Sequence, residues 1–148
     1  MRAVVQVVKK AKLISNGKEH SKIDKGYVVL LGIKEDDTQK DAEYLMGKIE
    51  KLRVFEDENG KLNLSLKDVG GSVLLVSNFT LYGTTIGQNR PSFIKSAHPE
   101  ISKPLYNYAV DILSKNVPVQ TGVFRTDMQI EMVADGPCTI IIDSEKTI

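Results

Sequence analysis

The run SVLLVSNF, residues 72–79, is the clearest guide to how this chain folds. It is continuously apolar from Val73 to Val76 and has the length of one strand, whereas a strand with one solvated face alternates polar and apolar residues. The run therefore predicts a central strand that is buried on both faces. The segment YVVLLGI, residues 27–33, has the same character and predicts a second buried strand.

Outward from this pair, periodicity and turn signals predict the other elements. Asn16-Gly17 suits a type I′ hairpin turn, because both central positions of that turn need positive φ. Thr38 is a suitable N-cap for an amphipathic helix that reaches Leu52, and Pro104 marks the start of a second helix. We expect further strands at 2–9, 11–15, 18–23, 119–124, 128–133 and 138–143. We also expect a turn at 59–60 beside a short strand, and a long functional loop at 83–99.

These elements predict an α+β fold in one domain, residues 1–148, with a largely antiparallel sheet or open barrel and two packed helices. Lys and Arg number 20 against 19 Asp and Glu, so the net charge gives no sign of binding to a long duplex. Cys138 is the only cysteine, which excludes an internal disulfide and fits a reducing cytosol. No apolar run approaches membrane-spanning length and no secretion signal occurs, so we expect a cytoplasmic protein without a membrane partner. His20 and His98 lack ligand partners at metal spacing, so we expect no metal and no cofactor.

Two short stretches combine small polar groups with apolar strands: Ser77–Thr80 and Gly136-Pro137. Thr80 has no base nearby in the sequence that would activate it as a nucleophile, and a Thr at a strand end is most often structural. Main-chain N–H groups at Ser77–Thr80 would suit an oxyanion, and the carbonyls of Gly136 and Pro137 would suit an ammonium group. The residues by themselves thus indicate an acyl-transfer or amine-binding site, with an ordinary tight turn as the alternative.

From Met1 to Asp143 the chain closely resembles the D-aminoacyl-tRNA deacylase family, of the D-Tyr-tRNA deacylase type. The stretches that carry the resemblance are MRAVVQ, KGYVVLLGI, LRVFEDENGKLNLSL, SNFTLYG, NRPSF, PVQTGVF and DGPCTIIID. The family's first motif, usually Ser-Gln-x-Thr, falls at Ser77–Thr80. Its second, Asn-x-Gly-Pro-x-Thr, falls at 134–139.

The resemblance implies a cytosolic homodimer that hydrolyses the ester between a D-amino acid and the terminal adenosine of tRNA, with glycyl-tRNA as a further candidate substrate. It implies a cis Gly136-Pro137 peptide that enters the active site of the other subunit, where its carbonyls face the α-amino group and exclude an L side chain. Catalysis would depend on main chain near the first motif and on the ribose 2′-OH. The site residues are then Ser77, Asn78, Phe79 and Thr80 for catalysis, and Gly136, Pro137, Thr139 and Met128 for substrate binding.

Four positions depart from the family pattern. Asn78 replaces the usual Gln, Ala134 replaces the usual Asn, and Val7 stands where the family has an Arg that braces the Gly-Pro loop. Arg125-Thr126 replaces the usual Gly-Ala. We hypothesise that Arg125 takes the place of the missing arginine, with a solvent-facing Arg125 as the alternative. The departures leave two other functions open: a deacylase of relaxed chirality that acts on mischarged L-aminoacyl-tRNA, and a non-catalytic dimer that binds tRNA ends.

Overall fold

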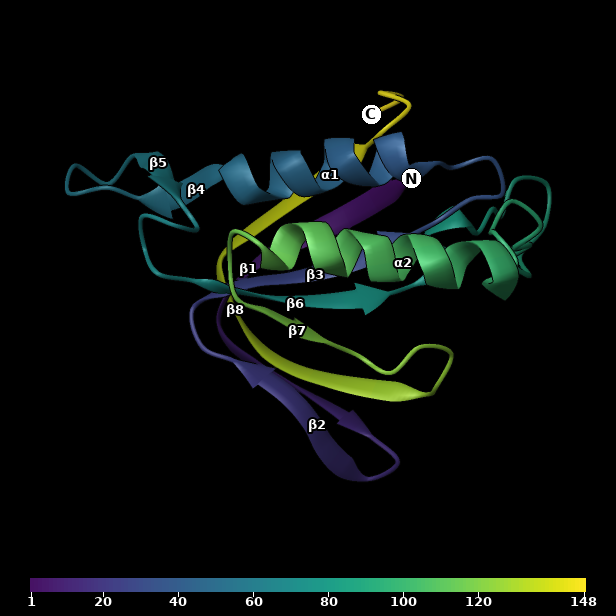
Figure 1. Ribbon diagram of the computed structural model, residues 1–148, viewed down its shortest axis with the longest axis horizontal. Coiled ribbons are helices and arrows are strands. Elements are labelled where there is room, and N and C mark those ends of the chain that lie inside the picture. The colour runs from purple at the N-terminus through teal and green to yellow at the C-terminus, as the bar shows by residue number, and fades with distance from the viewer.

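The computed structural model describes residues 1–148, in which two helices accompany a curved sheet and a small hairpin (Figure 1). The elements in chain order are β1 (Arg2–Ser15), β2 (Lys18–Ile23), β3 (Gly26–Gly32), α1 (Gln39–Lys51), β4 (Arg53–Glu56), β5 (Leu62–Ser65), β6 (Ser72–Ser77), the 3₁₀ helix η1 (Phe79–Tyr82), α2 (Pro99–Ser114), β7 (Val119–Thr121) and β8 (Met128–Asp143).

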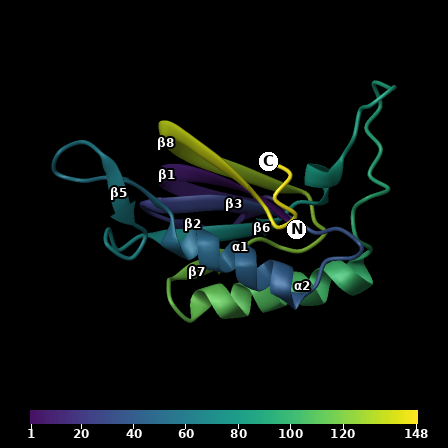
Figure 2. The same ribbon diagram turned by 90° about the horizontal axis from the view of Figure 1, so that it is seen from above.

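The main sheet has the order β2-β1-β3-β6-β7, and β8 pairs with the free side of β1. The pairs that involve β1 are antiparallel, while β6 lies parallel to β3 and β7. The sheet curls until its two ends approach, and Ser21 Oγ on β2 donates a hydrogen bond of 2.8 Å to Thr121 O on β7. The result is a nearly closed mixed barrel, and the predicted α+β class is confirmed. Both helices cover one face of the sheet (Figure 2).

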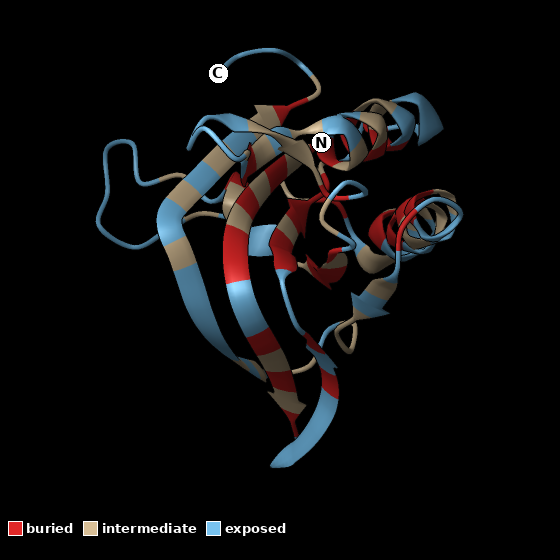
Figure 3. Ribbon diagram, turned by 90° about the vertical axis from the view of Figure 1, so that its left-hand side faces the viewer, coloured by how far each residue is buried: buried red, intermediate tan, exposed pale blue.

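Strand β6 is central, as its apolar run predicts, because the two sides of the strand face two different cores. Val73 and Leu75 point to the larger core between the sheet and the helices. Leu74 and Val76 point to a smaller core inside the curled strands. Buried residues follow the inner strands, whereas β8 is mostly exposed along its length (Figure 3).

Helix α1 begins after Thr38, as predicted. The Thr38 N–H donates to the Asp41 carboxylate at 2.8 Å, so the side chain satisfies a main-chain donor that the first turn leaves free. The predicted apolar stripe is buried, with Ala42, Leu45 and Ile49 fully inaccessible. Neither helix is long and apolar enough to cross a membrane.

Several predicted boundaries are wrong. Helix α2 begins at Pro99 rather than Pro104, because Pro99 occupies the first turn, where its missing N–H is not needed. The separate strands expected at 2–9 and 11–15 are one strand, β1, with register shifts near Val8. Those expected at 128–133 and 138–143 likewise form the continuous β8. β7 ends at Thr121, not at residue 124.

Candidate active site

The first motif lies where β6 ends and the chain turns into η1. The Asn78 N–H donates to Leu31 O at 2.8 Å, which is the last bond that ties this segment to β3. Asn78 then caps η1, because its side-chain oxygen accepts from the Thr80 N–H at 3.1 Å. The strand predicted to reach Phe79 therefore stops at Ser77, and the polar residues that follow it form a tight turn.

Hydrogen bonds inside this turn determine which groups are free to react. The Thr80 hydroxyl donates to Asn78 Oδ1, so the shortened amide at position 78 orients Thr80 rather than reaching outward. Ser96 Oγ donates to Phe79 O at 2.7 Å and fixes the turn to the loop before α2. The Phe79 N–H has no acceptor within the chain. Phe79 thus supplies a main-chain donor that is available to a ligand.

A cavity of about 750 Å³, called the site cavity below, opens beside this turn. Its walls come from the first motif, the loop before α2, the start of α2, the β7–β8 turn and the start of β8. The Phe79 side chain is 57% exposed and meets Phe93 edge-on, with ring centroids 5.1 Å apart. The cavity is lined by five of the residues that the resemblance implies for the site, whose roles stay predictions: Ser77, Asn78, Phe79, Thr80 and Met128.

Phe124 contributes another aromatic wall to the site cavity. It packs on Tyr106 of α2, with ring centroids 6.0 Å apart. Burial raises the pKa of Tyr106 to about 12, so its hydroxyl stays protonated and donates to Leu75 O at 2.7 Å. This buried bond ties α2 to β6 and so holds Phe124 opposite the first motif.

The second motif does not reach the site cavity of its own chain. Strand β8 pairs Met128 with Ser15 at one end and Thr139 with Gln6 farther along, so Gly136 and Pro137 lie beside the register shift at Val8. Gly136 lies eight residues beyond Met128 along the strand, which is roughly 25 Å at the usual rise. Within one chain the two motifs are therefore apart.

The Gly136-Pro137 peptide is cis and exposed. Gly136 has φ +121°, and a Cβ there would lie 2.8 Å from Cys138 N, so this position requires glycine. Cys138 packs against the larger core, as expected for a small apolar residue, while Thr139 is exposed.

The positions of Val7 and Arg125 bear on the hypothesis that Arg125 replaces the arginine that the family has at position 7. The Val7 side chain is buried in the larger core. Arg125 has φ +59° in the β7–β8 turn and lines the site cavity, before the start of β8, whereas Gly136 lies near the middle of that strand. It therefore does not brace the Gly-Pro segment of its own chain. Whether it meets that segment from another subunit stays a prediction.

Several wall residues escaped the sequence reasoning, among them Phe93, His98 and Thr126. For Phe93 the sequence did contain a signal, because this residue belongs to the NRPSF stretch and lies in the loop that we expected to be functional. The His98 N–H donates to Glu35 Oε2 at 3.2 Å, and this bond holds the start of α2 at the cavity. No group of three His, Cys, Asp or Glu side chains is placed to hold a metal ion.

Comparison with known proteins shows the family to which this chain belongs. A family model described as D-Tyr-tRNA(Tyr) deacylase matches residues 4–143. The chain belongs to this family. Family members named D-aminoacyl-tRNA deacylase include a protein of Clostridium acetobutylicum, 52% identical over 147 residues, and one of Caldicellulosiruptor bescii, 48% identical over 147 residues. In both cases the match covers 99% of each chain.

Solved structures agree on the fold of this deacylase family. A structure described as "c-Myc DNA Unwinding Element Binding Protein" has a TM-score of 0.91 and 39% identity, and the match covers 97% of this chain and 98% of that one. A probable eukaryotic D-amino acid tRNA deacylase has a TM-score of 0.79 at 16% identity, over 95% of this chain and 97% of that one. The second likeness concerns the fold alone.

Proposed function

We propose that this protein hydrolyses the ester bond of D-aminoacyl-tRNA and releases the free D-amino acid and tRNA. The observation that carries the proposal is the Phe79 N–H, which has no acceptor within the chain and belongs to a residue that lines the site cavity. Hydrolysis adds water to the ester carbonyl, so negative charge develops on the carbonyl oxygen. A fixed main-chain donor stabilises that charge without reorganisation. A tRNA substrate, and a single cysteine that fits a reducing compartment, support a cytoplasmic location.

The nucleophile in this mechanism is water rather than a side chain. The Thr80 hydroxyl already donates to Asn78 Oδ1, and no histidine or carboxylate accepts its proton. The ribose 2′-OH next to the ester is then the group that orients the water, as the resemblance implies. The water oxygen ends in the carboxyl group, and the C–O bond to the ribose breaks with a proton transferred to the ribose oxygen.

Chiral selection requires the second motif, which lies far from the site cavity of the same chain. A second copy of the chain would bring its own second motif to this site cavity. Strand β8 is paired on one side only and exposes Met132, Val133 and Ile141 at 41–52%. Apolar side chains on an open strand favour association with another chain. In the dimer that we propose, Gly136 and Pro137 of each subunit close the site cavity of the other.

Substituting Val133→Glu on β8 is expected to convert the dimer to a monomer, because two like charges would face each other near the middle of the shared strand surface. Light scattering measures the mass, and a deacylation assay measures the loss of D-selective activity. Leu62→Glu is the matched control, since Leu62 is 58% exposed on β5, away from this surface. A Val133→Glu monomer that retained full activity and selectivity would contradict insertion from a partner.

The substrate assignment is tested with a matched pair, D-Tyr-tRNA and L-Tyr-tRNA, by following ester loss above the spontaneous rate. We expect the D form to react at least about a hundredfold faster, which corresponds to about 2.7 kcal/mol of differential transition-state binding. Cleavage of both forms, or of the L form alone, would show that Val7, Asn78 and Ala134 rebuilt the site for a relaxed or altered substrate. Cleavage of neither form, repeated with glycyl-tRNA, would favour a protein that only binds tRNA ends.

A further inference from the structure

Residues 83–95, between η1 and α2, form an arm that projects from the body of the protein. Figure 2 shows the arm rising on the side of the sheet that carries β8, away from both helices. Apart from Thr84 and Ser92, every residue of the arm is exposed, and Ile86 is 92% exposed. The apolar side chain of Ile86 therefore has no cover within its own chain.

Hydrogen bonds within the arm give it a defined shape. Thr84 and Ser92 exchange two main-chain hydrogen bonds of 2.9 Å each, and the Gln88 N–H donates to Thr85 O at 3.1 Å. Gly87 has φ +74°, a conformation that glycine adopts readily in a tight turn. A preformed loop loses less conformational entropy on binding than a disordered one, so the arm is suited to contact a partner.

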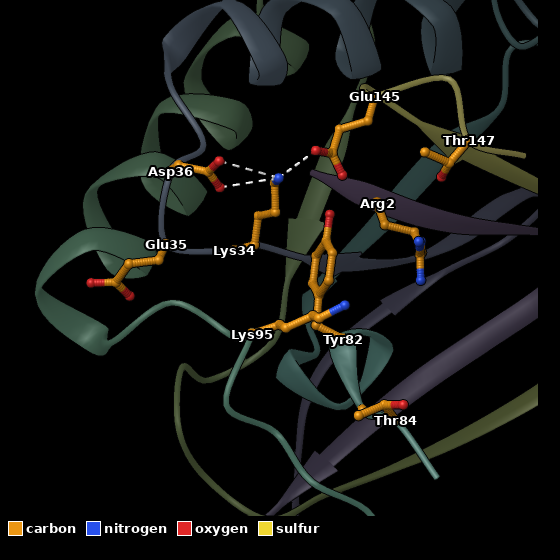
Figure 4. Close-up of a pocket in the computed structure, with 10 residues that line it drawn as sticks. Arg2, Lys34, Glu35, Asp36, Tyr82, Thr84, Lys95, Glu145 and Thr147 are labelled. Carbon is orange, nitrogen blue, oxygen red and sulfur yellow. Dashed lines mark hydrogen bonds and ion pairs between the residues drawn. The ribbon is translucent and has the colours of Figure 1, made fainter. Parts of the chain in front are cut away.

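The arm is also a cationic segment without carboxylates. Residues 83–99 include Arg90 and Lys95 but no Asp or Glu. Neither cation forms an ion pair within the chain. Figure 4 shows the contrast near the base of the arm, where two carboxylates hold Lys34 and none holds Lys95. The arm thus presents two positive charges that are available to a partner.

Strand β8 has the opposite charge. It contains three carboxylates and no Lys or Arg. Two of the carboxylates pair with cations of β1, which leaves Asp135 as the one carboxylate of β8 without an ion pair. Asp135 directly precedes the exposed Gly136-Pro137 segment. A free negative charge therefore lies next to the motif that closes the site cavity of the other subunit in the proposed dimer.

Two-fold symmetry brings the arm and this motif together. In a symmetric dimer, each contact between two different surfaces is repeated with the subunits exchanged. Phe93 of the arm and Ser96 just after it line the site cavity. When the partner's Gly136 and Pro137 close this cavity, they lie beside the base of the arm. The partner's Asp135 then lies there too.

We propose that the arm binds the partner subunit, where Arg90 pairs with the partner subunit's Asp135 and Ile86 packs on exposed apolar side chains of the partner's β8. This inference rests on the dimer of the proposed function. The cations alone would also suit an RNA backbone. The exposed isoleucine, on an arm that rises on the β8 side, favours a second copy of the chain. The arm is then a positioning element that holds the second motif in the site cavity.

The test reverses the two charges in separate chains. In the dimer of Arg90→Asp, and likewise in that of Asp135→Arg, like charges face each other at both copies of the contact. When the two variants are co-expressed, a mixed dimer has opposite charges at both copies. We expect native mass spectrometry to show a ratio of mixed to unmixed dimers about tenfold above random pairing, which corresponds to about 1.4 kcal/mol per dimer.

Lys115→Asp, co-expressed with Asp135→Arg, is the matched control. Lys115 follows α2 and lies outside the arm, so this mixture should pair at random. Random pairing of Arg90→Asp with Asp135→Arg would overturn the proposal. A monomeric wild-type protein would overturn it as well, together with the shared site. If mixed dimers predominate but the wild-type protein cleaves neither D-Tyr-tRNA nor glycyl-tRNA, the arm contact stands and the proposed activity fails.

Substrate chirality provides a second measurement. Arg90→Gln removes the charge without introducing another, so it should loosen the partner's second motif in the site cavity. We expect the ratio of kcat/KM for D-Tyr-tRNA to that for L-Tyr-tRNA to fall about tenfold, whereas Lys115→Gln should leave it unchanged. An arm that binds RNA would instead lower kcat/KM equally for both substrates. That result, with random pairing of the charge-reversed chains, would identify the arm as an RNA contact and reject the proposal.

Discussion

Replacing Phe79 with proline is expected to reduce kcat for D-Tyr-tRNA by about 10²–10³-fold, because proline removes the one main-chain donor that we assign to the oxyanion. We expect the backbone to accept this change. Phe79 is the first residue of η1, where proline is favoured, and Asn78 before it is extended, with φ −141° and ψ 94°.

The substitution also removes the aromatic ring, so Phe79→Ala is the necessary partner experiment. Alanine keeps the N–H but loses the contact with Phe93, and we expect its effect to fall mainly on KM. Steady-state kinetics of the two variants, with circular dichroism to confirm folding, separates the donor from the ring. Equal kcat values for Phe79→Pro and Phe79→Ala would reject a catalytic role for the Phe79 N–H.

The second large effect concerns stability. Gly26→Ala is expected to lower the free energy of unfolding by at least about 4 kcal/mol, a large share of the roughly 5–15 kcal/mol that holds a typical domain. Gly26 opens β3 opposite Ser72 of β6. A Cβ at Gly26 would lie 1.8 Å from the Ser72 carbonyl oxygen and 2.7 Å from the Ser72 nitrogen. Both are backbone atoms, so no side-chain rotation relieves the clash, and the two central strands must separate.

Gly47→Ala provides the comparison within the same chain. Gly47 lies in α1, and a Cβ there would meet no atom within 4 Å. Alanine in the middle of a helix is favoured over glycine by about 0.5–1 kcal/mol, so this variant should be slightly more stable. Denaturant unfolding followed by circular dichroism measures both. An unfolding midpoint for Gly26→Ala close to that of the wild type would show that the parallel β3–β6 pairing is not as tight as described.

Features that depend on residues close together in the sequence were predictable. The apolar run of β6 indicated a strand buried on two sides, and Leu74 and Leu75 do face different cores. The Thr38 cap and the apolar stripe of α1 follow from helical periodicity within fewer than fifteen residues. Small polar residues after a buried strand indicated an acyl-transfer or amine-binding site or an ordinary tight turn, and the family resemblance assigned the four residues of the first motif to catalysis. The structure places all four at one cavity, and their catalytic role stays a prediction.

Other features required the tertiary structure, because they arise between residues that are distant in the chain. β1 and β8 are continuous strands since they pair with each other along most of their length, from Arg2 with Asp143 to Ser15 with Met128. No local signal carries a pairing across more than a hundred residues. The same pairing determines that Gly136 lies far from Phe79 within one chain, although the resemblance implies that both are site residues. The residues alone thus indicated most of the elements, and the resemblance indicated the first motif, because both depend on short stretches of sequence. Long-range packing decided which motifs share a cavity and left the Tyr82 hydroxyl without a partner, because it brings together residues that are distant in the chain.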